Sequence, residues 1–351
     1  MPSSYRLSYF PPPGRGESLL SWVDRVAAEF GVGRSAALAA LGSDAALNRG
    51  FSRLLAGADP AVGQIIATRA GLPAAGVAAM TGKPFLDLAW RPVIDRNYCG
   101  LKGFDDIHSA VCPECLVESG GRWLIRWRLL LLVVCPVHRC YLISRCRCGH
   151  LLHGTDRGIR SRVECGLTAT RFTGEKHPGS PRKPCSIAVA DLRAPMLTDK
   201  GIAEAQVLIF AELTGGGRAN GHSPTPWTDL ELAIELVLYT ASPQMLSATD
   251  PGVYRQFLWF CSIRPFMMSR SPNWFMRTVR NQTFLDQRLL TAAVLKIAAG
   301  LVWSADRSAA AEAFHRAGGV EPWMLYRAVS AGTPCALADI FTVHLGEASP
   351  R

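Results

Sequence analysis

The chain has 351 residues, eleven cysteines and a formal net charge of +10, so it is long enough for two or three domains and basic enough to predict a polyanionic partner. Its longest aliphatic run, residues 129–134, is much shorter than the roughly 20 residues of a membrane-spanning helix, and the prolines from Pro11 follow the N-terminus without the apolar run of a signal peptide. We therefore expect a cytoplasmic protein with no membrane partner, and in the cytoplasm cysteines favour metal binding over disulfides.

Residues 1–91 are predicted to form a helical N-terminal domain. A helix is expected to begin just after Ser18, which is a plausible cap. The apolar residues that follow recur at the three and four spacing of one helix face; they are Leu19, Trp22, Val23, Val26 and Ala27.

A helix-turn-helix-like pair is predicted later in the same domain. Ala67, Gly71 and Val77 occupy the positions expected of a small residue at the helix crossing, a turn glycine and an aliphatic residue in the second helix. The second helix, residues 73–81, has almost no side chain that can hydrogen-bond a base edge. We therefore expect it to pack against protein rather than to read a DNA sequence.

The central segment, residues 92–184, contains two pairs of potential metal ligands. Cys112 and Cys115 are separated by two residues, as are Cys135 and His138, and each pair begins with Cys-Pro. Three thiolates and one imidazole at this spacing are typical of a closed tetrahedral zinc site, which stabilises a fold and does no chemistry. We predict a zinc-finger or zinc-ribbon module; the alternative is that four metal-free groups lie near one another in a core.

A short helix is predicted to lead into Cys135. Apolar residues recur here at helical spacing, which favours a helix over a strand; they are Trp123, Trp127, Leu130, Leu131 and Val134. We expect the two tryptophans to pack in the core of the module rather than to stack on bases.

Basic residues are concentrated around the proposed ligands. Residues 121–185 contain thirteen Arg or Lys and three acidic residues, which accounts for the whole net charge. Such clustering is typical of contact with a phosphate backbone, although a solvated basic face or an acidic protein partner is the alternative. The predicted nucleic-acid-binding residues are Arg122, Arg126, Arg139, Arg145, Arg147, Arg160 and Arg162.

Residues 185–227 are predicted to be a linker with one helix. The helical stretch covers residues 198–213, and three consecutive glycines from Gly215 and a proline-rich connection follow it. Clustered glycine and proline favour a connection over a packed element.

Residues 228–351 are predicted to form a helical C-terminal domain. Thr228 and Glu231 fit a capping box at the start of its first helix, and another helix is expected near residues 284–299. Residues 307–327 fit either a second helix-turn-helix or a plain helical hairpin. The fold class predicted for the whole chain is thus mostly α, with a central zinc module.

Enzymatic alternatives fit the sequence poorly. Zinc deaminases place His-x-Glu before Pro-Cys-x-x-Cys and keep one coordination position open, whereas Ala110 stands two residues after His108 and the proline follows Cys112. Asp105 and Asp106 have no matching carboxylate pair for a two-metal nuclease site. We therefore expect no catalytic residues.

Three motifs together resemble the TniQ family, which is related to TnsD. They are Pro13-Gly14-x-Gly16-Glu17-Ser18-Leu19-Leu20-Ser21-Trp22, the first Cys-Pro-x-Cys, and Trp-Arg-Leu ahead of Cys-Pro-Val-His. The resemblance implies a non-catalytic accessory factor of DNA transposition that selects or marks the target site and recruits an AAA+ ATPase and a transposase. Some members of the family are adapters to an RNA-guided CRISPR effector and act as dimers, so the partners implied include DNA, a guide-RNA complex and a second copy of the chain.

The resemblance also implies a second zinc site. Cys146, Cys148 and Cys165 match three of its four ligands, but the fourth position is Arg162, whose protonated guanidinium cannot bind a cation. Either another group completes this site or the site is degenerate. The candidates are His150, His153, His177 and Cys185. Cys140 is expected to belong to the surroundings of the first site.

Two functional hypotheses lead from these observations. The first is a transposition target-selection adapter in which a zinc-stapled basic module contacts DNA or a guide complex and helical domains bind proteins. The second is a zinc-containing, sequence-specific DNA-binding regulator unrelated to transposition. A metal-dependent enzyme is a distant third, because the predicted ligand set leaves no open coordination position.

Overall fold

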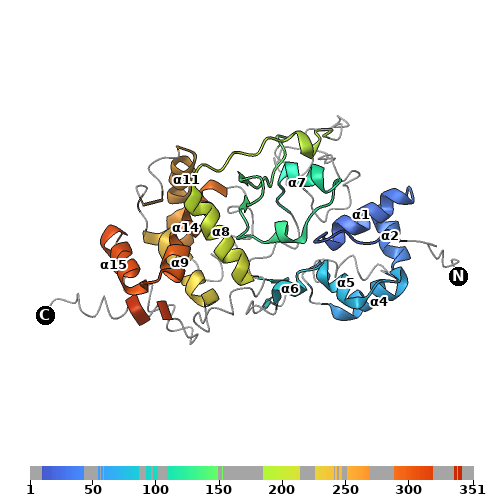
Figure 1. Cartoon of the computed structure of the whole chain (residues 1–351), viewed down its shortest axis with the longest axis horizontal. Helices are drawn as coiled ribbons and strands as arrows, with labels where there is room; N and C mark the ends of the chain where they lie inside the picture. The colour runs from blue at the N-terminus through green and yellow to red at the C-terminus, as the bar shows by residue number, and fades with distance from the viewer. Residues whose placement is uncertain are drawn as a thin grey trace. The chain divides into compact units, whose positions relative to one another are not determined.

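The computed structural model of the chain is mostly α-helical, as predicted, and divides into two compact units, Met1–Met196 and Leu197–Arg351 (Figure 1). We describe the two units separately. The boundaries of the four predicted segments stay a prediction. The structure describes residues 10–42, 54–55, 57, 59–86, 92–95, 98–101, 109–148, 152, 185–213, 226–240, 242, 245–246, 251–268, 288–318, 336–337 and 339–341.

The predicted opening helix is confirmed as α1, Leu19–Glu29. Ser18 caps it, because its hydroxyl accepts a hydrogen bond from the backbone N–H of Ser21 at 3.2 Å. The five apolar residues that predicted the helix are all buried. Trp22 also donates its indole N–H to the carbonyl of Pro11 at 2.8 Å, which fixes the preceding proline segment against the helix.

The helix-turn-helix-like pair is confirmed as a packing unit. It consists of α4, Pro60–Ala70, and α5, Ala74–Ala79, which pack against each other. Gly71 ends α4 with a φ of 67°, a left-handed conformation in which glycine is favoured because it has no Cβ. Ala67 and Val77 are fully buried in a core shared with α1 and α2, Arg34–Ala40.

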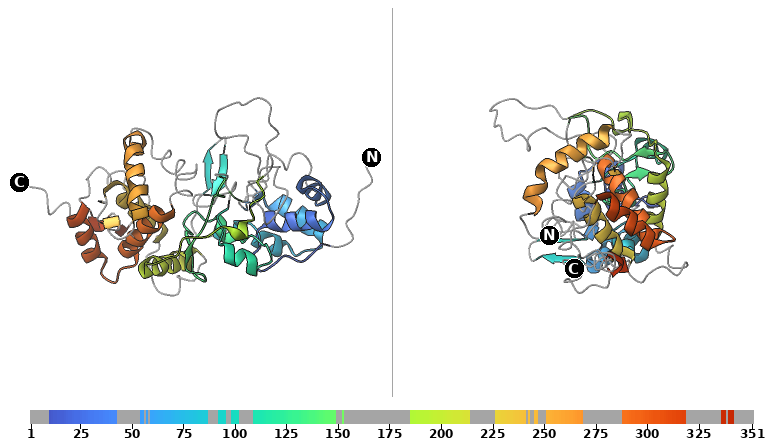
Figure 2. Two further views of the ribbon diagram at one scale, coloured as in Figure 1. Left: turned by 90° about the horizontal axis from the view of Figure 1, so that it is seen from above. Right: turned by 90° about the vertical axis from the view of Figure 1, so that its left-hand side faces the viewer.

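Between these helices and the cysteine-rich region, α6, Lys83–Leu86, precedes a two-stranded ribbon. Strands β1, Pro92–Asp95, and β2, Tyr98–Leu101, pair antiparallel, with Pro92 opposite Leu101 (Figure 2). The ribbon is separate from the ligand-bearing hairpin described below.

The prediction of a helix leading into Cys135 is wrong. The structure has a single 3₁₀ turn there, η1, Ile125–Arg128, and Cys135 closes the short strand β3, Val134–Cys135. Every residue from 129 to 135 is buried. A surface helix buries one stripe only, whereas this fully buried run forms a turn at residues 130–131 followed by extended chain. The expectation for Trp123 and Trp127 fits the structure, because both are buried and their rings meet edge to face.

Backbone hydrogen bonds join the cysteine-rich region to α1. The N–H of Ser18 donates to the carbonyl of Trp123 at 2.8 Å, and the N–H of Ile125 donates to the carbonyl of Gly16 at 2.9 Å. The hydroxyl of Ser21 accepts from the N–H of Trp123 at 3.0 Å. The residues that cap α1 therefore also position the start of the cysteine-rich region.

Residues 185–196 lie against the same region. The N–H of Tyr141 donates to the carbonyl of Pro195 at 2.8 Å, and Cys140 forms a β-bridge with Met196. A 3₁₀ turn, η2, Val189–Asp191, packs against α7, Pro113–Glu118. This stretch, which follows the central segment in sequence, is therefore part of the first compact unit.

The second unit is mostly helical in its described residues, which include no strand. Helix α14, Arg288–Trp303, packs against α8, Lys200–Leu213, α9, Pro226–Thr240, α11, Pro251–Met268, and α15, Arg307–Gly318. The helices expected at 198–213 and near 284–299 correspond to α8 and α14. No described helix is long and apolar enough to cross a membrane.

The prediction that a capping box at Thr228 starts the helix is wrong, because α9 begins two residues earlier, at Pro226. Proline suits the first helical turn, since its fixed φ matches the helix and its missing N–H is not needed there. The neighbouring Asp229 is fully buried instead: it accepts a hydrogen bond from Arg307 at 2.6 Å and one from the N–H of Leu337 at 3.0 Å. The first helix of the second predicted helix-turn-helix corresponds to α15, Arg307–Gly318, whereas residues 319–327 lie outside the described residues.

Candidate metal centre

Cys112 and Cys115 are placed by the start of α7. Cys112 is the N-cap residue and Pro113 occupies the first helical position, where its fixed φ favours the helix. The carbonyls of Cys112 and Cys115 accept helical hydrogen bonds from Leu116 at 3.0 Å and Ser119 at 2.9 Å. One helical turn thus directs both sulfurs toward the same point.

Cys135 and His138 come from the hairpin of β3 and β4, Cys140–Tyr141, in which Cys135 pairs with Cys140. Arg139 completes the turn with a φ of 48°, a left-handed conformation uncommon for residues other than glycine. The backbone N–H of His138 donates to the Cys135 sulfur at 3.5 Å. The turn therefore brings the imidazole over the thiol of Cys135.

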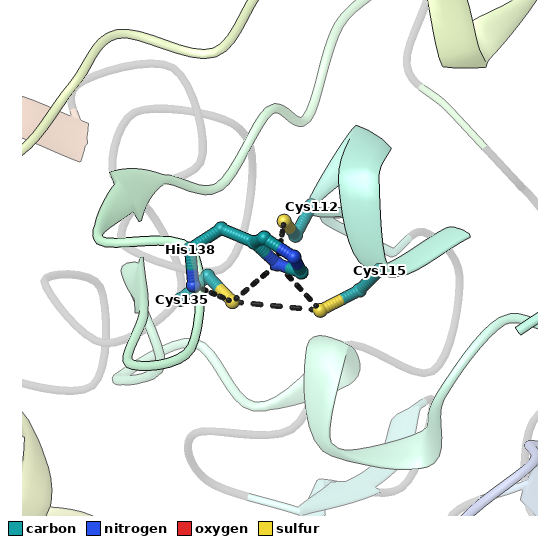
Figure 3. Close-up of side chains that lie close together, drawn as sticks. All are labelled: Cys112, Cys115, Cys135 and His138. Carbon is teal, nitrogen blue, oxygen red and sulfur yellow. Dashed lines mark hydrogen bonds between the residues drawn. The ribbon is translucent and has the colours of Figure 1, made fainter. Parts of the chain in front are cut away.

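The four predicted ligands Cys112, Cys115, Cys135 and His138 lie together, with donor atoms all within 4.8 Å of one another (Figure 3). We call them the first cluster. His138 Nδ1 lies 3.4, 3.2 and 3.7 Å from the sulfurs of Cys112, Cys115 and Cys135, and the last two sulfurs are 3.5 Å apart. A zinc tetrahedron with the usual bond lengths has edges of about 3.8 Å between sulfurs and about 3.6 Å between sulfur and nitrogen. The donor set and its dimensions fit zinc.

Glu118 orients the imidazole and was not predicted from the sequence. Its carboxylate lies 3.0 Å from His138 Nε2, so Nε2 carries the proton in the metal-binding tautomer and Nδ1 faces the sulfurs. Glu118 stands three residues after Cys115, which places both on one side of α7. That spacing was a usable signal, because a carboxylate commonly accepts the second N–H of a metal-binding histidine.

Without a metal, the donors of the first cluster share their protons unevenly. Hydrogen bonding to Cys115 lowers the pKa of Cys112, and hydrogen bonding to Cys112 lowers that of Cys135. Hydrogen bonding to Cys112 and to Cys135 raises the pKa of the Cys115 thiol. Burial favours neutral His138, but hydrogen bonds to Cys135 and Glu118 outweigh burial and raise its pKa to about 9. At neutral pH, zinc must therefore displace the imidazole proton and at least one thiol proton.

The affinity of the first cluster for zinc is expected to rise with pH. Below the His138 pKa of about 9 the metal-free site holds protons that zinc must release, so the apparent dissociation constant should fall about tenfold per pH unit for each proton released. Competition against a chromophoric chelator, corrected for the chelator's own protonation, measures this from about pH 6 to pH 8. An affinity independent of pH over this range contradicts the proposed donors.

Cys140 lies beside the first cluster, as expected. Its sulfur is 3.6 Å from that of Cys112, and the two form a separate potential metal-binding group with the exposed carboxylate of Glu114. Cys140 is fully buried, and its hydrogen bond to Cys112 raises its thiol pKa. It is therefore a protonated neighbour that can donate to the Cys112 sulfur.

A second group of cysteines lies nearby in sequence. Cys146, Cys148 and Cys185 have sulfurs within 4.8 Å of one another, with 3.8 Å between Cys146 and Cys185. We call them the second cluster. Of the residues considered for the second site, the structure thus joins Cys146 and Cys148 to Cys185. The remaining ones lie outside the described residues; they are Cys165, His150, His153 and His177.

The predicted nucleic-acid-binding arginines differ in exposure. Arg139 and Arg147 are exposed, whereas Arg122, Arg126 and Arg145 are half-buried. Arg122 is held in place, since its Nε donates to the carbonyl of Ser119 at 2.6 Å. Arg160 and Arg162 lie outside the described residues. Their role in nucleic-acid binding stays a prediction.

Backbone hydrogen bonds join the helices of the first unit to a small module with a Cys₃His donor set. The chain is therefore a helical protein with a potential structural metal centre. Residues 8–142 match the TniQ family, so this part of the chain is a TniQ family domain. The domain implies a transposition-associated protein, and TniQ proteins are generally non-catalytic. No curated protein and no solved structure matches the chain.

Proposed function

We propose that this chain is a non-catalytic adapter of DNA transposition that selects or marks the target site and recruits an AAA+ ATPase and a transposase. The observation that carries the proposal is the TniQ domain at residues 8–142. A role as adapter to an RNA-guided complex falls within the same proposal, because such a complex also presents a phosphate backbone to the basic module.

The geometry of the first cluster supports a structural role for its metal. Four protein donors at tetrahedral distances fill the coordination sphere of zinc, so no position remains for water or substrate. The cluster instead connects α7 to the β3–β4 hairpin, and the exposed Arg139 lies on the surface of that hairpin's turn. In the proposed function, the metal holds this surface in one conformation.

The exposed arginines of the module support contact with a phosphate backbone. Arg139 lies in the ligand-bearing turn and Arg147 lies between two cysteines of the second cluster. Each of the two is adjacent in sequence to a predicted metal ligand, so a bound metal would hold the backbone at these arginines in place. By contrast, α5, with the sequence AAGVAA, has no side chain suited to base readout. The module is therefore better suited to sequence-independent binding than to operator recognition.

Exposed apolar side chains of the second unit support a protein partner. Tyr254, Leu258 and Trp259 are each more than 40% exposed on α11, and their spacing places them along one side of that helix. Aromatic side chains of this kind are enriched in protein interfaces. We assign this surface to the transposition machinery or to a second copy of the chain.

The proposal is tested with the full-length protein in two measurements. Duplex DNA of unrelated sequences is expected to bind weakly and about equally, with dissociation constants of roughly 10⁻⁴ to 10⁻⁶ M at physiological salt. A transposition AAA+ ATPase, co-expressed with the chain, is expected to co-purify specifically with it. A single sequence bound at roughly 10⁻⁸ M or tighter, without capture of the ATPase, overturns the proposal in favour of a DNA-binding regulator.

A further inference from the structure

A fourth thiol lies against the first cluster without being part of its donor set. The sulfur of Cys140 is 3.6 Å from that of Cys112, whereas the first cluster already supplies the four donors that zinc takes in a structural site. When zinc is bound, Cys140 is therefore a thiol in contact with a metal-bound thiolate. Sulfurs joined in a disulfide are about 2.05 Å apart, so these two are roughly 1.5 Å too far apart for a bond.

Backbone contacts hold the two cysteines at this separation. Val111, which precedes Cys112, exchanges two hydrogen bonds of 2.8 Å with Ile143, just after β4. Cys140 is paired with Cys135 in the β3–β4 hairpin. The chains that carry the two sulfurs are thus fixed beside each other, and side-chain rotation is sufficient to close the remaining gap.

We propose that Cys112 and Cys140 form a site of oxidative modification, at which a hydroperoxide links them in a disulfide and zinc leaves the first cluster. With hydrogen peroxide, the Cys112 thiolate attacks one oxygen, the oxygen–oxygen bond breaks and hydroxide leaves, which gives a sulfenic acid. The Cys140 thiol then attacks that sulfur: the sulfur–sulfur bond forms, the sulfur–oxygen bond breaks, and the oxygen takes the thiol proton and leaves as water. The two sulfurs supply the two electrons that reduce the peroxide.

An exposed carboxylate covers this pair of sulfurs. Cys112 and Cys140 are fully buried, and the exposed Glu114 lies 3.3 Å from the first sulfur and 4.0 Å from the second. Movement of this one surface side chain admits a molecule as small as peroxide. The other close sulfur pair, Cys115 and Cys135 at 3.5 Å, consists of two proposed ligands, whose electron pairs are donated to the metal. Cys140 is therefore the thiol placed to complete the disulfide.

The disulfide removes one ligand and replaces its structural link. The donors that remain are one fewer than a closed zinc site requires, so zinc is expected to leave. The new bond joins the N-cap residue of α7 to β4, and α7 and the hairpin are the elements that the metal connects. The oxidised module should thus stay folded and regain zinc on reduction. The inference rests on zinc binding by the first cluster and is independent of the role in transposition.

Treatment of the full-length, zinc-loaded protein with one equivalent of hydrogen peroxide tests the inference. Zinc captured by a chromophoric chelator and a Cys112–Cys140 disulfide found by mass spectrometry are expected to appear at the same rate. Dithiothreitol and added zinc should restore the zinc content. Cys140→Ser keeps all four ligands and should bind zinc normally, but its Cys112 sulfenic acid should advance to sulfinic acid, which dithiothreitol does not reduce. Cys261→Ser is the matched control and should behave as the unmodified protein does, because Cys261 belongs to neither cluster.

The disulfide map of the unmodified protein decides the case in which Cys140→Ser does not fold. Zinc release with a Cys115–Cys135 disulfide, or with no disulfide, in place of the Cys112–Cys140 bond overturns the inference. So does folded Cys140→Ser that releases zinc and regains it after reduction as the unmodified protein does. Absence of zinc from the reduced protein overturns the assignment of the first cluster as well, whereas a failure confined to the disulfide leaves that assignment intact.

Discussion

Cys115→Ser is expected to remove zinc from the first cluster and to unfold the module around it. A serine hydroxyl does not ionise at neutral pH and is a poor zinc ligand, and structural zinc supplies roughly 10–16 kcal/mol of binding free energy in small zinc domains. Cys115 is a sharper choice than Cys112, because the sulfur of Cys140 lies 3.6 Å from that of Cys112 and is able to replace it. No such substitute lies beside Cys115 among the groups of potential ligands in the described residues.

The effect should extend beyond the module. Ser18 and Ser21 at the start of α1 hydrogen-bond to Trp123, so loss of the cysteine-rich region also removes partners of α1. Zinc content and thermal unfolding measure the result: one zinc ion per chain should be lost, and the unfolding transition of the first unit should become less cooperative. Cys261→Ser serves as the control, because Cys261 is a free cysteine of α11 that belongs to neither cluster. Full zinc content together with an unchanged melting temperature in Cys115→Ser contradicts the assignment of the first cluster.

The elements predicted correctly were those defined by neighbouring residues. The cap at Ser18 and the apolar spacing after it are local signals for α1, and the structure has both. Gly71 marks the turn between α4 and α5 for an equally local reason, because its left-handed backbone favours glycine. The two Cys-Pro pairs likewise determine short structures that present two donors each, and the structure brings these pairs together.

The features that were missed depend on contacts between distant residues. The apolar spacing of residues 123–134 favours a helix only if one face is buried, and the structure buries the whole run from 129 onward against other parts of the unit. Similarly, the sequence ranks Cys185 no higher than three histidines as a candidate ligand. Its position beside Cys146 depends on the packing of residues 185–196 against the β3–β4 hairpin, which no local pattern encodes.

Combined substitution of Arg139→Gly, Arg145→Ala and Arg147→Ala is expected to weaken nucleic-acid binding about equally across sequences. Each phosphate contact contributes about 0.9 to the slope of log affinity against log salt, so loss of three contacts should lower the slope by about 2.7 and the affinity by roughly 500-fold at 0.1 M salt. Glycine is chosen at residue 139 because the φ of 48° there suits it better than alanine. This choice keeps the ligand-bearing turn intact, so that a loss of binding reflects charge rather than misfolding.

Fluorescence anisotropy of labelled duplex DNA at several salt concentrations measures both quantities. The matched control is Lys200→Ala, Arg255→Ala and Arg316→Ala, which removes the same charge from exposed positions of the second unit. Zinc content should remain unchanged in both proteins. If the control loses as much affinity as the module variant, total charge rather than the basic module governs binding. If the module variant binds with unchanged affinity and slope, its arginines contact another partner, and an acidic protein surface becomes the better assignment.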